Sequence, residues 1–312
     1  MGFKVLITDG LEKEGLDIIN AAGEAVNKKG IEAAELLEII GEYDGLIVRG
    51  RTKVTKEVFE AAKNLKAVGR AGVGVDNIDL EAAKAHGVTV VNAPVATTIA
   101  VAELGFGMML ALVRSIPQTD AAMKQEKWTK KDYKGYELNG KTLGVVGYGN
   151  IGSTIGRYAQ ALGMKVVAYD PLIKPEVILA AGAQPVQLDD IYAQSDIITF
   201  HVPLIPTPKH MINDEAFAKM KDGVMLVNVA RGGIIEEAAL LRAFESGKVA
   251  GAALDVYEKE PPVDWAVPTH PKVIAVPHVG GQTEEAQLRV AGDIASEVMN
   301  VLQGNPLRWK IC

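Results

Sequence analysis

Three polar side chains follow short apolar runs in the last third of the sequence, and their types suit chemistry on a small acid. They are Arg231, Glu260 and His278. A guanidinium clamps a carboxylate with two parallel hydrogen bonds, better than an ammonium does. A histidine held by a carboxylate keeps one tautomer and can pass a proton to or from a reacting oxygen. Each residue alone also fits a plainer role: a surface ion pair, a solvated loop acid or a loop histidine.

A glycine-rich run lies earlier in the chain, at Gly147 to Gly152, with the sequence GYGNIG. A strand-like segment precedes it and a helix-like segment follows, which is the context that a pyrophosphate-binding turn requires. The helix amino terminus then faces the anion. Asp170 ends the next strand-like run, 23 residues after Gly147, and a carboxylate there accepts ribose hydroxyls and repels a 2′-phosphate. We therefore expect NAD rather than NADP. The plainer reading is an ordinary strand-to-helix connection.

The elements that must position these residues alternate along the chain as β-branched apolar runs and Ala/Leu/Glu/Lys-rich helical stretches. This alternation predicts an α/β fold with parallel sheets covered by helices. Strands of a first series are predicted at Lys4 to Thr8, Gly45 to Val48, Ala67 to Gly69 and Val88 to Asn92. Strands of a second series are predicted at Leu143 to Val146, Lys165 to Tyr169, Ile197 to His201, Val224 to Val229, Ala250 to Leu254 and Val273 to Val276. Six strands suit a dinucleotide-binding sheet.

Two doubly wound domains follow from these two series. A long apolar helical stretch, Thr98 to Lys124, separates them, and a helix after Thr283 ends the chain. We expect the chain to cross between domains at both places. The substrate domain then comprises residues 1–97 with 284–312, the NAD-binding domain comprises residues 98–283, and the active-site cleft lies between them.

Composition excludes several other classes of protein. The 312 residues carry 33 basic and 39 acidic side chains, so no basic excess suggests nucleic acid or an anionic membrane as a partner. A single cysteine, Cys312, argues against disulfides and cysteine metal clusters, and we expect no metal site. The amino terminus lacks the apolar stretch of a signal peptide, and no run reaches transmembrane length. We expect a cytoplasmic protein.

These segments, taken together over nearly the whole chain, resemble the D-2-hydroxyacid dehydrogenase family. The resemblance rests on the glycine run with Asp170, on Asn228 to Gly233, on Leu254 to Glu260, and on Pro277-His278. It implies a flavodoxin-like substrate domain and a Rossmann NAD-binding domain. It also implies that Arg231 binds the substrate carboxylate and polarises its carbonyl, that His278 is the acid/base, and that Glu260 tunes His278. The chain departs from the family at Thr97, where members often carry asparagine.

The resemblance implies two further sets of residues. Those expected to line the NAD site are Gly147, Gly149, Asn150, Ile151, Gly152, Asp170, Val202, Pro203, Val229, Ala230, Arg231, Asp255, His278, Gly280 and Gly281. Those expected to bind the substrate are Arg49, Arg70, Val73, Gly74, Arg231 and His278.

Within the family, the chain is most similar to the short D-3-phosphoglycerate dehydrogenases, through residues 48–55, the Arg70 loop and residues 137–142. A phosphorylated substrate needs further cations, for which Arg49, Arg51 and Arg70 are candidates, with Lys130 or Lys131 from a neighbouring subunit. We expect 3-phosphoglycerate as substrate, a homodimer built on the Ile99 to Val113 helix and no serine feedback. Alternatives are a glyoxylate/hydroxypyruvate reductase, a D-lactate dehydrogenase or, in another class, an NAD-sensing interaction protein.

Overall fold

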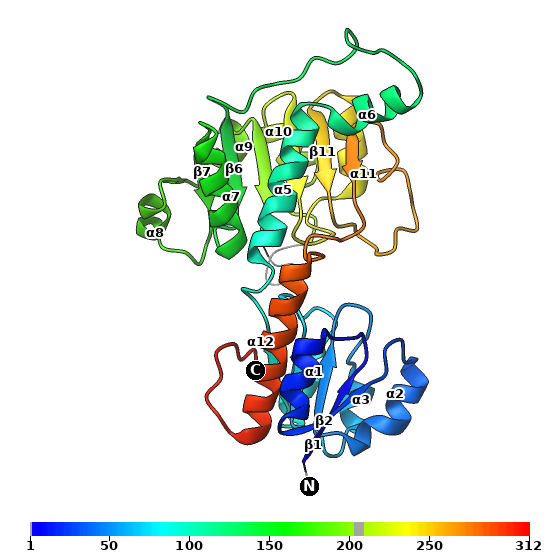
Figure 1. The fold of residues 1–312 in the computed structure, drawn as a ribbon. Coiled ribbons are helices and arrows are strands. Elements are labelled where there is room, and N and C mark those ends of the chain that lie inside the picture. Colours follow the sequence, from blue (N-terminus) through cyan, green and yellow to red (C-terminus); the bar gives the residue numbers. More distant parts are fainter. Residues whose placement is uncertain (1, 203–208) are drawn as a thin grey trace. The chain divides into compact units, whose positions relative to one another are not determined.

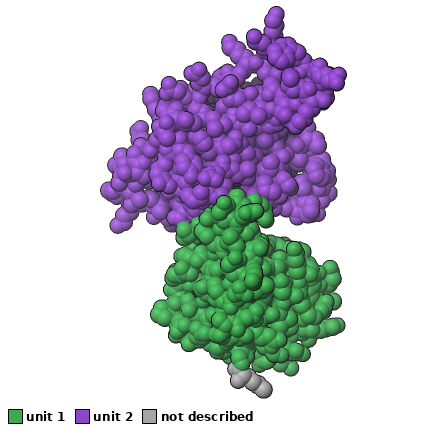
Figure 2. Space-filling view, in the orientation of Figure 1, with its two compact units in different colours: residues 1–97, 281–312 green, residues 98–280 purple. Residues whose placement is uncertain are grey.

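The chain forms two compact units in a computed structural model that describes residues 2–202 and 209–312. Unit 1 comprises Met1–Thr97 with Gly281–Cys312, and unit 2 comprises Thr98–Gly280 (Figure 2). The chain returns to unit 1 at Gly281 rather than after Thr283. Each unit holds one parallel sheet with helices on its faces, so the predicted α/β class is confirmed (Figure 1).

The sheet of unit 1 has the strand order β2-β1-β3-β4-β5, with all neighbours parallel. This is the flavodoxin-like order. The strands are β1 (Phe3–Ile7), β2 (Gly23–Asn27), β3 (Gly45–Val48), β4 (Ala67–Arg70) and β5 (Thr89–Asn92). Strand β2 escaped prediction because it is an edge strand without an apolar run, and none of its residues is fully buried.

The helices of unit 1 include one from the far end of the chain. They are α1 (Lys13–Asn20), α2 (Ala33–Ile39), the 3-10 turn η1 (Ile40–Glu42), α3 (Lys56–Ala61), α4 (Leu80–Ala85) and α12 (Glu284–Gln303). Helix α12 lies along α1 and packs on β3, β4 and β5 (Figure 1). Its Ile294 and Val298 are fully buried and pack against Gly69. A Cβ added to Gly69 would lie 2.5 Å from the Val298 side chain. A glycine is needed in β4 for this close approach.

The sheet of unit 2 has the order β12-β11-β10-β9-β6-β7-β8 and is parallel throughout. Its first six strands in chain order are arranged as in the Rossmann fold, which confirms that prediction. The strands are β6 (Thr142–Val146), β7 (Lys165–Tyr169), β8 (Gln184–Pro185), β9 (Ile197–Phe200), β10 (Val224–Asn228), β11 (Val249–Leu254) and β12 (Val273–Ala275). The unpredicted β8 has two residues and is too short for a periodic signal.

Seven helices are described in unit 2: α5 (Thr98–Val113), α6 (Ile116–Lys124), α7 (Asn150–Ala161), α8 (Pro175–Ala180), α9 (Leu188–Gln194), α10 (Asp214–Lys219) and α11 (Glu237–Glu245). Helix α5 packs against α7 and β11, and most of its apolar side chains are buried in the core. In the described part of the chain no single helix has the length and apolar character to cross a membrane. Helices α5 and α6 meet that test only as a pair bent by 67°.

Candidate active site

Arg231, Glu260 and His278 follow three neighbouring strands of the unit 2 sheet. Strand β11 lies between β10 and β12, and the last residues of the three strands are in register. Because the strands are parallel, their carboxyl ends meet at one edge, where open α/β sheets bind ligands. The three side chains are therefore grouped by the sheet order, which the sequence does not reveal.

His278 and Glu260 form a direct pair. The Nδ1 atom of His278 lies 2.6 Å from Oε2 of Glu260, and the amide of Tyr257 donates to Oε1 at 3.1 Å. Burial opposes ionisation of Glu260, but the hydrogen bond and charge of His278, the Tyr257 amide and the charge of Arg231 together lower its pKa. An ionised Glu260 accepts a hydrogen bond from the Nδ1–H group, so Nε2 of His278 is the atom left to exchange a proton with a ligand.

A buried carboxylate holds the His278 loop in place. Asp255, which is 1% exposed, accepts the amides of Val279 at 2.6 Å and Gly280 at 2.9 Å. Burial raises the pKa of Asp255, and these two amide donors oppose the rise. His278 itself has a φ of 53°, a left-handed conformation that costs a non-glycine residue free energy. The bonds to Asp255 secure the loop in that conformation.

The turn that carries Arg231 is fixed at both ends by Asn228. Its side chain accepts the amide of Ala230 at 3.1 Å and donates to the carbonyl of Arg231 at 3.0 Å. Beyond it, a Cβ on Gly232 would collide with the Tyr257 carbonyl, so only glycine lets this turn approach the β11 loop so closely. The turn carrying Arg231 and the loop carrying Glu260 are therefore packed backbone to backbone.

Two more contacts hold the Glu260 loop, and sequence reasoning missed both. The Tyr257 hydroxyl lies within hydrogen-bond distance of the Leu254 and Val276 carbonyls, at 3.2 and 3.1 Å, and thus links the ends of β11 and β12. Glu237 and Glu258 each accept the backbone amide of the other at 2.8 Å, which ties this loop to the start of α11. A surface glutamate pair has no sequence signal.

The glycine run forms the turn between β6 and α7 that its spacing predicts. Gly147 has a φ of 91°, and a Cβ there would lie 2.8 Å from the His201 carbonyl. A Cβ on Gly152 would collide with the Gly147 carbonyl. Gly149 precedes α7 without a capping side chain, and a Cβ there would meet no described atom within 4 Å. The first amides of α7 are thus open to an anion, and the residues present fit a dinucleotide.

Asp170 lies directly beside this turn, at the end of β7. Its Oδ2 accepts the Tyr148 amide at 2.7 Å, and its Oδ1 accepts the amides of Leu172 and Ile173 at 2.8 and 3.1 Å. A carboxylate offers about four acceptor positions, so these three amides leave about one for a ribose hydroxyl. The sequence suggested two ribose contacts; the structure shows that Asp170 also orders the turn.

The remaining expected cofactor residues are spread along the same edge of the unit 2 sheet, except Gly281, which begins the second segment of unit 1. Asn150 and Ile151 begin α7, Val202 follows β9, and Val229 and Ala230 follow β10. Pro203 lies outside the described residues. Within the described ranges, no three His, Cys, Asp or Glu side chains are grouped as ligands for a metal ion.

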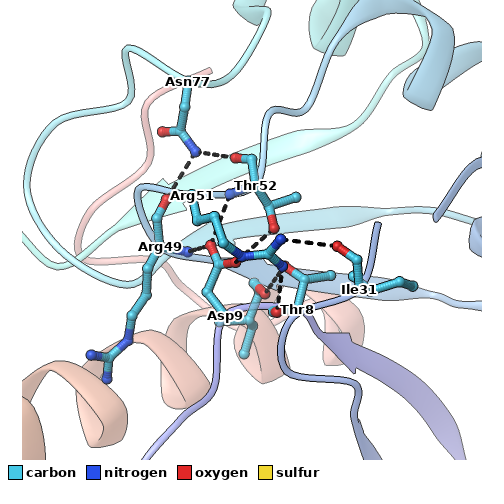
Figure 3. Close-up of polar contacts among 8 residues, drawn as sticks. Thr8, Asp9, Ile31, Arg49, Arg51, Thr52 and Asn77 are labelled. Atoms are coloured by element: carbon cyan, nitrogen blue, oxygen red, sulfur yellow. Dashed lines mark hydrogen bonds and ion pairs between the residues drawn. The ribbon is translucent and has the colours of Figure 1, made fainter. Parts of the chain in front are cut away.

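In unit 1, Asp9 organises the loop after β3. Its carboxylate accepts the amides of Arg49 and Thr52 at 2.7 and 3.1 Å, the Thr52 hydroxyl at 2.7 Å and Nε of Arg51 at 3.2 Å (Figure 3). The side chain of Asn77 completes the loop by donating to the Arg49 and Thr52 carbonyls. Asp9 follows β1, and its place after a strand was the only sequence signal.

Arg49 and Arg51 have different roles in this loop. The Arg51 guanidinium also donates to the Thr8 and Ile31 carbonyls, at 3.1 and 3.0 Å. Arg51 therefore holds the fold of this loop, and it is a weaker candidate for a phosphate contact than Arg49. The Arg49 side chain extends away from the cluster (Figure 3). Its Nη1 donates to the side-chain oxygen of Gln287. Burial lowers the pKa of Arg49, an effect that the charges of Glu12 and Asp9 oppose.

Arg70 ends β4, beside the end of β3, so Arg49 and Arg70 lie at neighbouring strand ends. A Cβ on Gly72 would collide with the Arg70 guanidinium, which folds back over the loop. The carbonyl of Val73 accepts the side chain of Asn92 at 2.6 Å, and Val73 and Gly74 stay partly exposed. The loop thus presents its backbone at the carboxyl edge of the unit 1 sheet.

Several exposed apolar side chains of unit 2 lie in residues 114–136, which we call the 114–136 segment. Trp128 is 78%, Met123 55% and Ile116 51% exposed. They line a hollow of about 720 Å³ together with Arg114, Thr119, Thr129, Lys130, Tyr133 and Gly135. The dimer surface was expected on helix α5, but most apolar side chains of α5 are buried in the core of unit 2.

Comparison with known proteins identifies the class that this fold and site define. Residues 106–280 match the model of the D-isomer specific 2-hydroxyacid dehydrogenase family, NAD binding domain. The chain belongs to this family, as its resemblance predicted, and NAD is its cofactor. Beyond the class, it is 48% identical over 305 residues to the D-3-phosphoglycerate dehydrogenase of Rattus norvegicus, a match covering 97% of this chain and 57% of that relative. The chain thus spans little more than half the length of that relative.

Two solved structures share the fold over nearly their whole length. A glyoxylate reductase from Paecilomyes thermophila has a TM-score of 0.91 and 30% identity, with 99% of this chain and 98% of that chain covered. A D-lactate dehydrogenase from Aquifex aeolicus, complexed with NAD and lactic acid, has a TM-score of 0.86 and 29% identity, with 96% of each chain covered.

Proposed function

We propose that this protein is an NAD-dependent dehydrogenase that interconverts a D-2-hydroxy acid and its 2-oxo acid, with 3-phosphoglycerate and 3-phosphohydroxypyruvate as the substrate pair. The observation that carries the proposal is the His278–Glu260 pair at 2.6 Å, at the same sheet edge as Arg231 and in the NAD-binding domain of this family. An ionised acid that fixes a histidine tautomer is the arrangement needed to move a proton at a substrate oxygen.

The three residues divide the work in this proposal. Arg231 binds the substrate carboxylate with two hydrogen bonds and draws electron density from the adjacent carbonyl. His278 gives a proton to the carbonyl oxygen in the reduction, or takes it from the hydroxyl in the oxidation, through Nε2. Glu260 holds Nδ1 and stabilises the imidazolium. NAD, when bound, accepts the hydride in the oxidation and returns it as NADH in the reduction.

The glycine turn, Asp170 and the sheet edge hold the cofactor in this proposal. The first amides of α7 bind the pyrophosphate, and the remaining acceptor position of Asp170 binds a ribose hydroxyl. The other expected cofactor residues, Val202, Pro203, Val229, Ala230, Asp255, Gly280 and Gly281, complete the site. For Asp255 the role is indirect, since both of its oxygens already hold the amides of the His278 loop.

A phosphorylated substrate is favoured by the cations of unit 1 and by the similarity to phosphoglycerate dehydrogenases. We assign Arg49 and Arg70 to the phosphate and the backbone of Val73 and Gly74 to the carboxylate. The half-buried Arg49 is the stronger candidate of the two, because a guanidinium with little water around it gains most from a dianion.

Parallel NADH assays test the function. Oxidation of NADH is followed with 3-phosphohydroxypyruvate, hydroxypyruvate, glyoxylate and pyruvate. We expect the highest kcat/KM with 3-phosphohydroxypyruvate and none with NADH alone. Preference for glyoxylate or pyruvate would instead place the protein with the reductase or lactate enzymes that share its fold. NADH binding without turnover on any of these acids would favour an NAD-sensing interaction protein.

We also propose a homodimer in which the 114–136 segment of each subunit packs on the other. Its exposed Trp128 and Met123 are large apolar side chains around a hollow, and such patches typically mark protein interfaces. Lys130 lines the same hollow, so a neighbouring subunit would bring this cation, or Lys131 beside it, with the segment.

A further inference from the structure

Gln287 connects the proposed phosphate contact to the point where the chain enters unit 1 for the second time. It lies in the first turn of α12 and accepts a hydrogen bond from Nη1 of Arg49. Its own amide nitrogen donates to the Gly281 carbonyl at 2.6 Å. One side chain therefore fixes the Arg49 guanidinium and the start of the segment that leads into α12.

Chemistry determines how the Gln287 amide is turned. A guanidinium has only donors and a carbonyl only acceptors, so the amide oxygen must face Arg49 and the amide nitrogen must face Gly281. Glutamate would serve Arg49 but would place an acceptor against the Gly281 carbonyl. Methionine, of similar length, would serve neither. Glutamine suits this position because it is neutral and offers both a donor and an acceptor.

The neutrality of Gln287 matters because Arg49 has no anionic hydrogen-bond partner among the described residues. The carboxylate of Asp9 takes the backbone amide of Arg49, but its side-chain contacts are with Arg51 and Thr52 (Figure 3). Within the part of the chain that the structure describes, Nε and Nη2 of Arg49 are buried without a hydrogen-bond partner. The guanidinium is thus held at one nitrogen by a neutral group. The charges of Glu12 and Asp9 act on it, but no carboxylate among the described residues accepts a hydrogen bond from its side chain.

We propose that Gln287 is a positioning residue that sets specificity for a phosphorylated substrate, by orienting the Arg49 guanidinium without neutralising its charge. This inference rests on the proposed function, in which Arg49 binds the substrate phosphate. It goes further by assigning the selectivity to a residue of α12 that has no place in the reaction itself. A buried donor left without its acceptor binds an incoming anion more strongly than one already paired with a carboxylate.

The test compares Gln287→Glu and Gln287→Met with the wild type. The kcat and KM are measured with 3-phosphohydroxypyruvate and with hydroxypyruvate, which lacks the phosphate, and the Kd for NADH is measured by fluorescence. The ratio of interest is kcat/KM with 3-phosphohydroxypyruvate divided by kcat/KM with hydroxypyruvate. We expect Gln287→Glu to lower this ratio by about tenfold or more, mainly by raising KM for the phosphorylated acid. Gln287→Met should lower it less, since orientation is lost but charge is kept. Gln303→Glu, the same change at the exposed far end of α12, is the matched control and should leave the ratio unchanged.

Arg49→Met separates failure of this inference from failure of the proposed function. If the wild type has no preference for the phosphorylated acid, or Arg49→Met keeps that preference, the phosphate assignment and this inference both fall. If Arg49→Met loses the preference while both Gln287 variants keep it, only the inference is wrong. An equal loss with both acids would mean a structural role and also overturn it. In the double variant Arg49→Met/Gln287→Glu, we expect no loss of the ratio beyond that of Arg49→Met.

Discussion

At the scale of single residues, the candidate active site is built from charges that are held by backbone amides. Glu260 and Asp255 each accept amide hydrogen bonds from loops that follow the strands, and Glu260 also holds His278. Such bonds hold the side chains in place before a substrate arrives, so little reorganisation is needed during the reaction. Substitutions here should therefore separate chemistry from binding.

His278→Ala should abolish most turnover and leave cofactor binding nearly intact. The loss of the proton donor is expected to lower kcat by about 10²- to 10⁴-fold. The Kd for NADH should change little, because the glycine turn and Asp170 are untouched. Steady-state kinetics and NADH fluorescence check this, and a variant with wild-type kcat would remove His278 from the mechanism.

Glu260→Gln should make stability less dependent on pH. The pKa of Glu260 is lowered in the folded protein, so ionised Glu260 stabilises the fold above its ordinary pKa, and this contribution disappears as the pH falls through the lowered value. The free energy of unfolding should thus differ most between wild type and variant near neutral pH and converge in acid. Urea unfolding at pH 7, 5, 4 and 3 measures the difference. A gap that stays constant with pH would contradict the ionised pair.

At the scale of elements, the loops after β10, β11 and β12 behave as one layer. The layer is held by the close approach of Gly232 to Tyr257, by the Tyr257 hydroxyl between two strand ends, and by the Glu237–Glu258 exchange. None of these contacts touches Arg231 or His278 directly, but all of them restrict where those side chains can lie. A change in the backbone of one loop should therefore shift the side chains carried by the other two.

Gly232→Ala should impair turnover more than cofactor binding. The new Cβ collides with the Tyr257 backbone, which cannot move without shifting Glu260, and relieving such a clash costs about 1–3 kcal/mol of stability. We expect a lower melting temperature and a lower kcat with NADH affinity largely kept. Gly292→Ala on α12 is the matched control: its Cβ meets no described atom within 4 Å, and it should stabilise the helix by up to about 1 kcal/mol. Equal effects of the two substitutions would refute the close approach.

At the scale of the whole molecule, each of the two sheets carries its proposed ligand-binding residues after the carboxyl ends of its strands. Unit 1 presents Arg49 and Arg70 there, and unit 2 presents the proposed catalytic residues. Each unit has separate buried clusters of side chains, and α12 joins the last segment of the chain to the first sheet. The exposed apolar side chains of the 114–136 segment line a hollow, and this is the surface that we assign to a second copy of the chain.

Met123→Asp should dissociate the proposed homodimer. A charge placed in an apolar interface is expected to raise the dimer dissociation constant by about tenfold or more. Sedimentation equilibrium should give the wild type twice the 33.2 kDa mass of one chain, with a lower average mass for the variant. Leu179→Asp, at an exposed apolar residue of α8 outside the hollow, should leave the mass unchanged. A monomeric wild type would disprove the dimer.

The sequence by itself determined the elements with strong periodicity and the turns with special chemistry. Buried strands such as β10 and β11 are continuous apolar runs, and the glycine turn carries its own spacing, so the α/β class, the family and NAD were all predictable. The edge strands β2 and β8 were not, because a short or half-exposed strand lacks an apolar signal.

Only the tertiary structure decided which residues meet. The order β12-β11-β10 brings three strand ends together, although the residues they carry lie far apart in the chain. The tertiary structure also shows that Arg51 and Arg49 have different roles. Arg51 donates to backbone carbonyls of the fold, whereas Arg49 donates to Gln287. Local sequence specifies the conformation of a segment, whereas side-chain partners depend on contacts between distant segments, which no local pattern records.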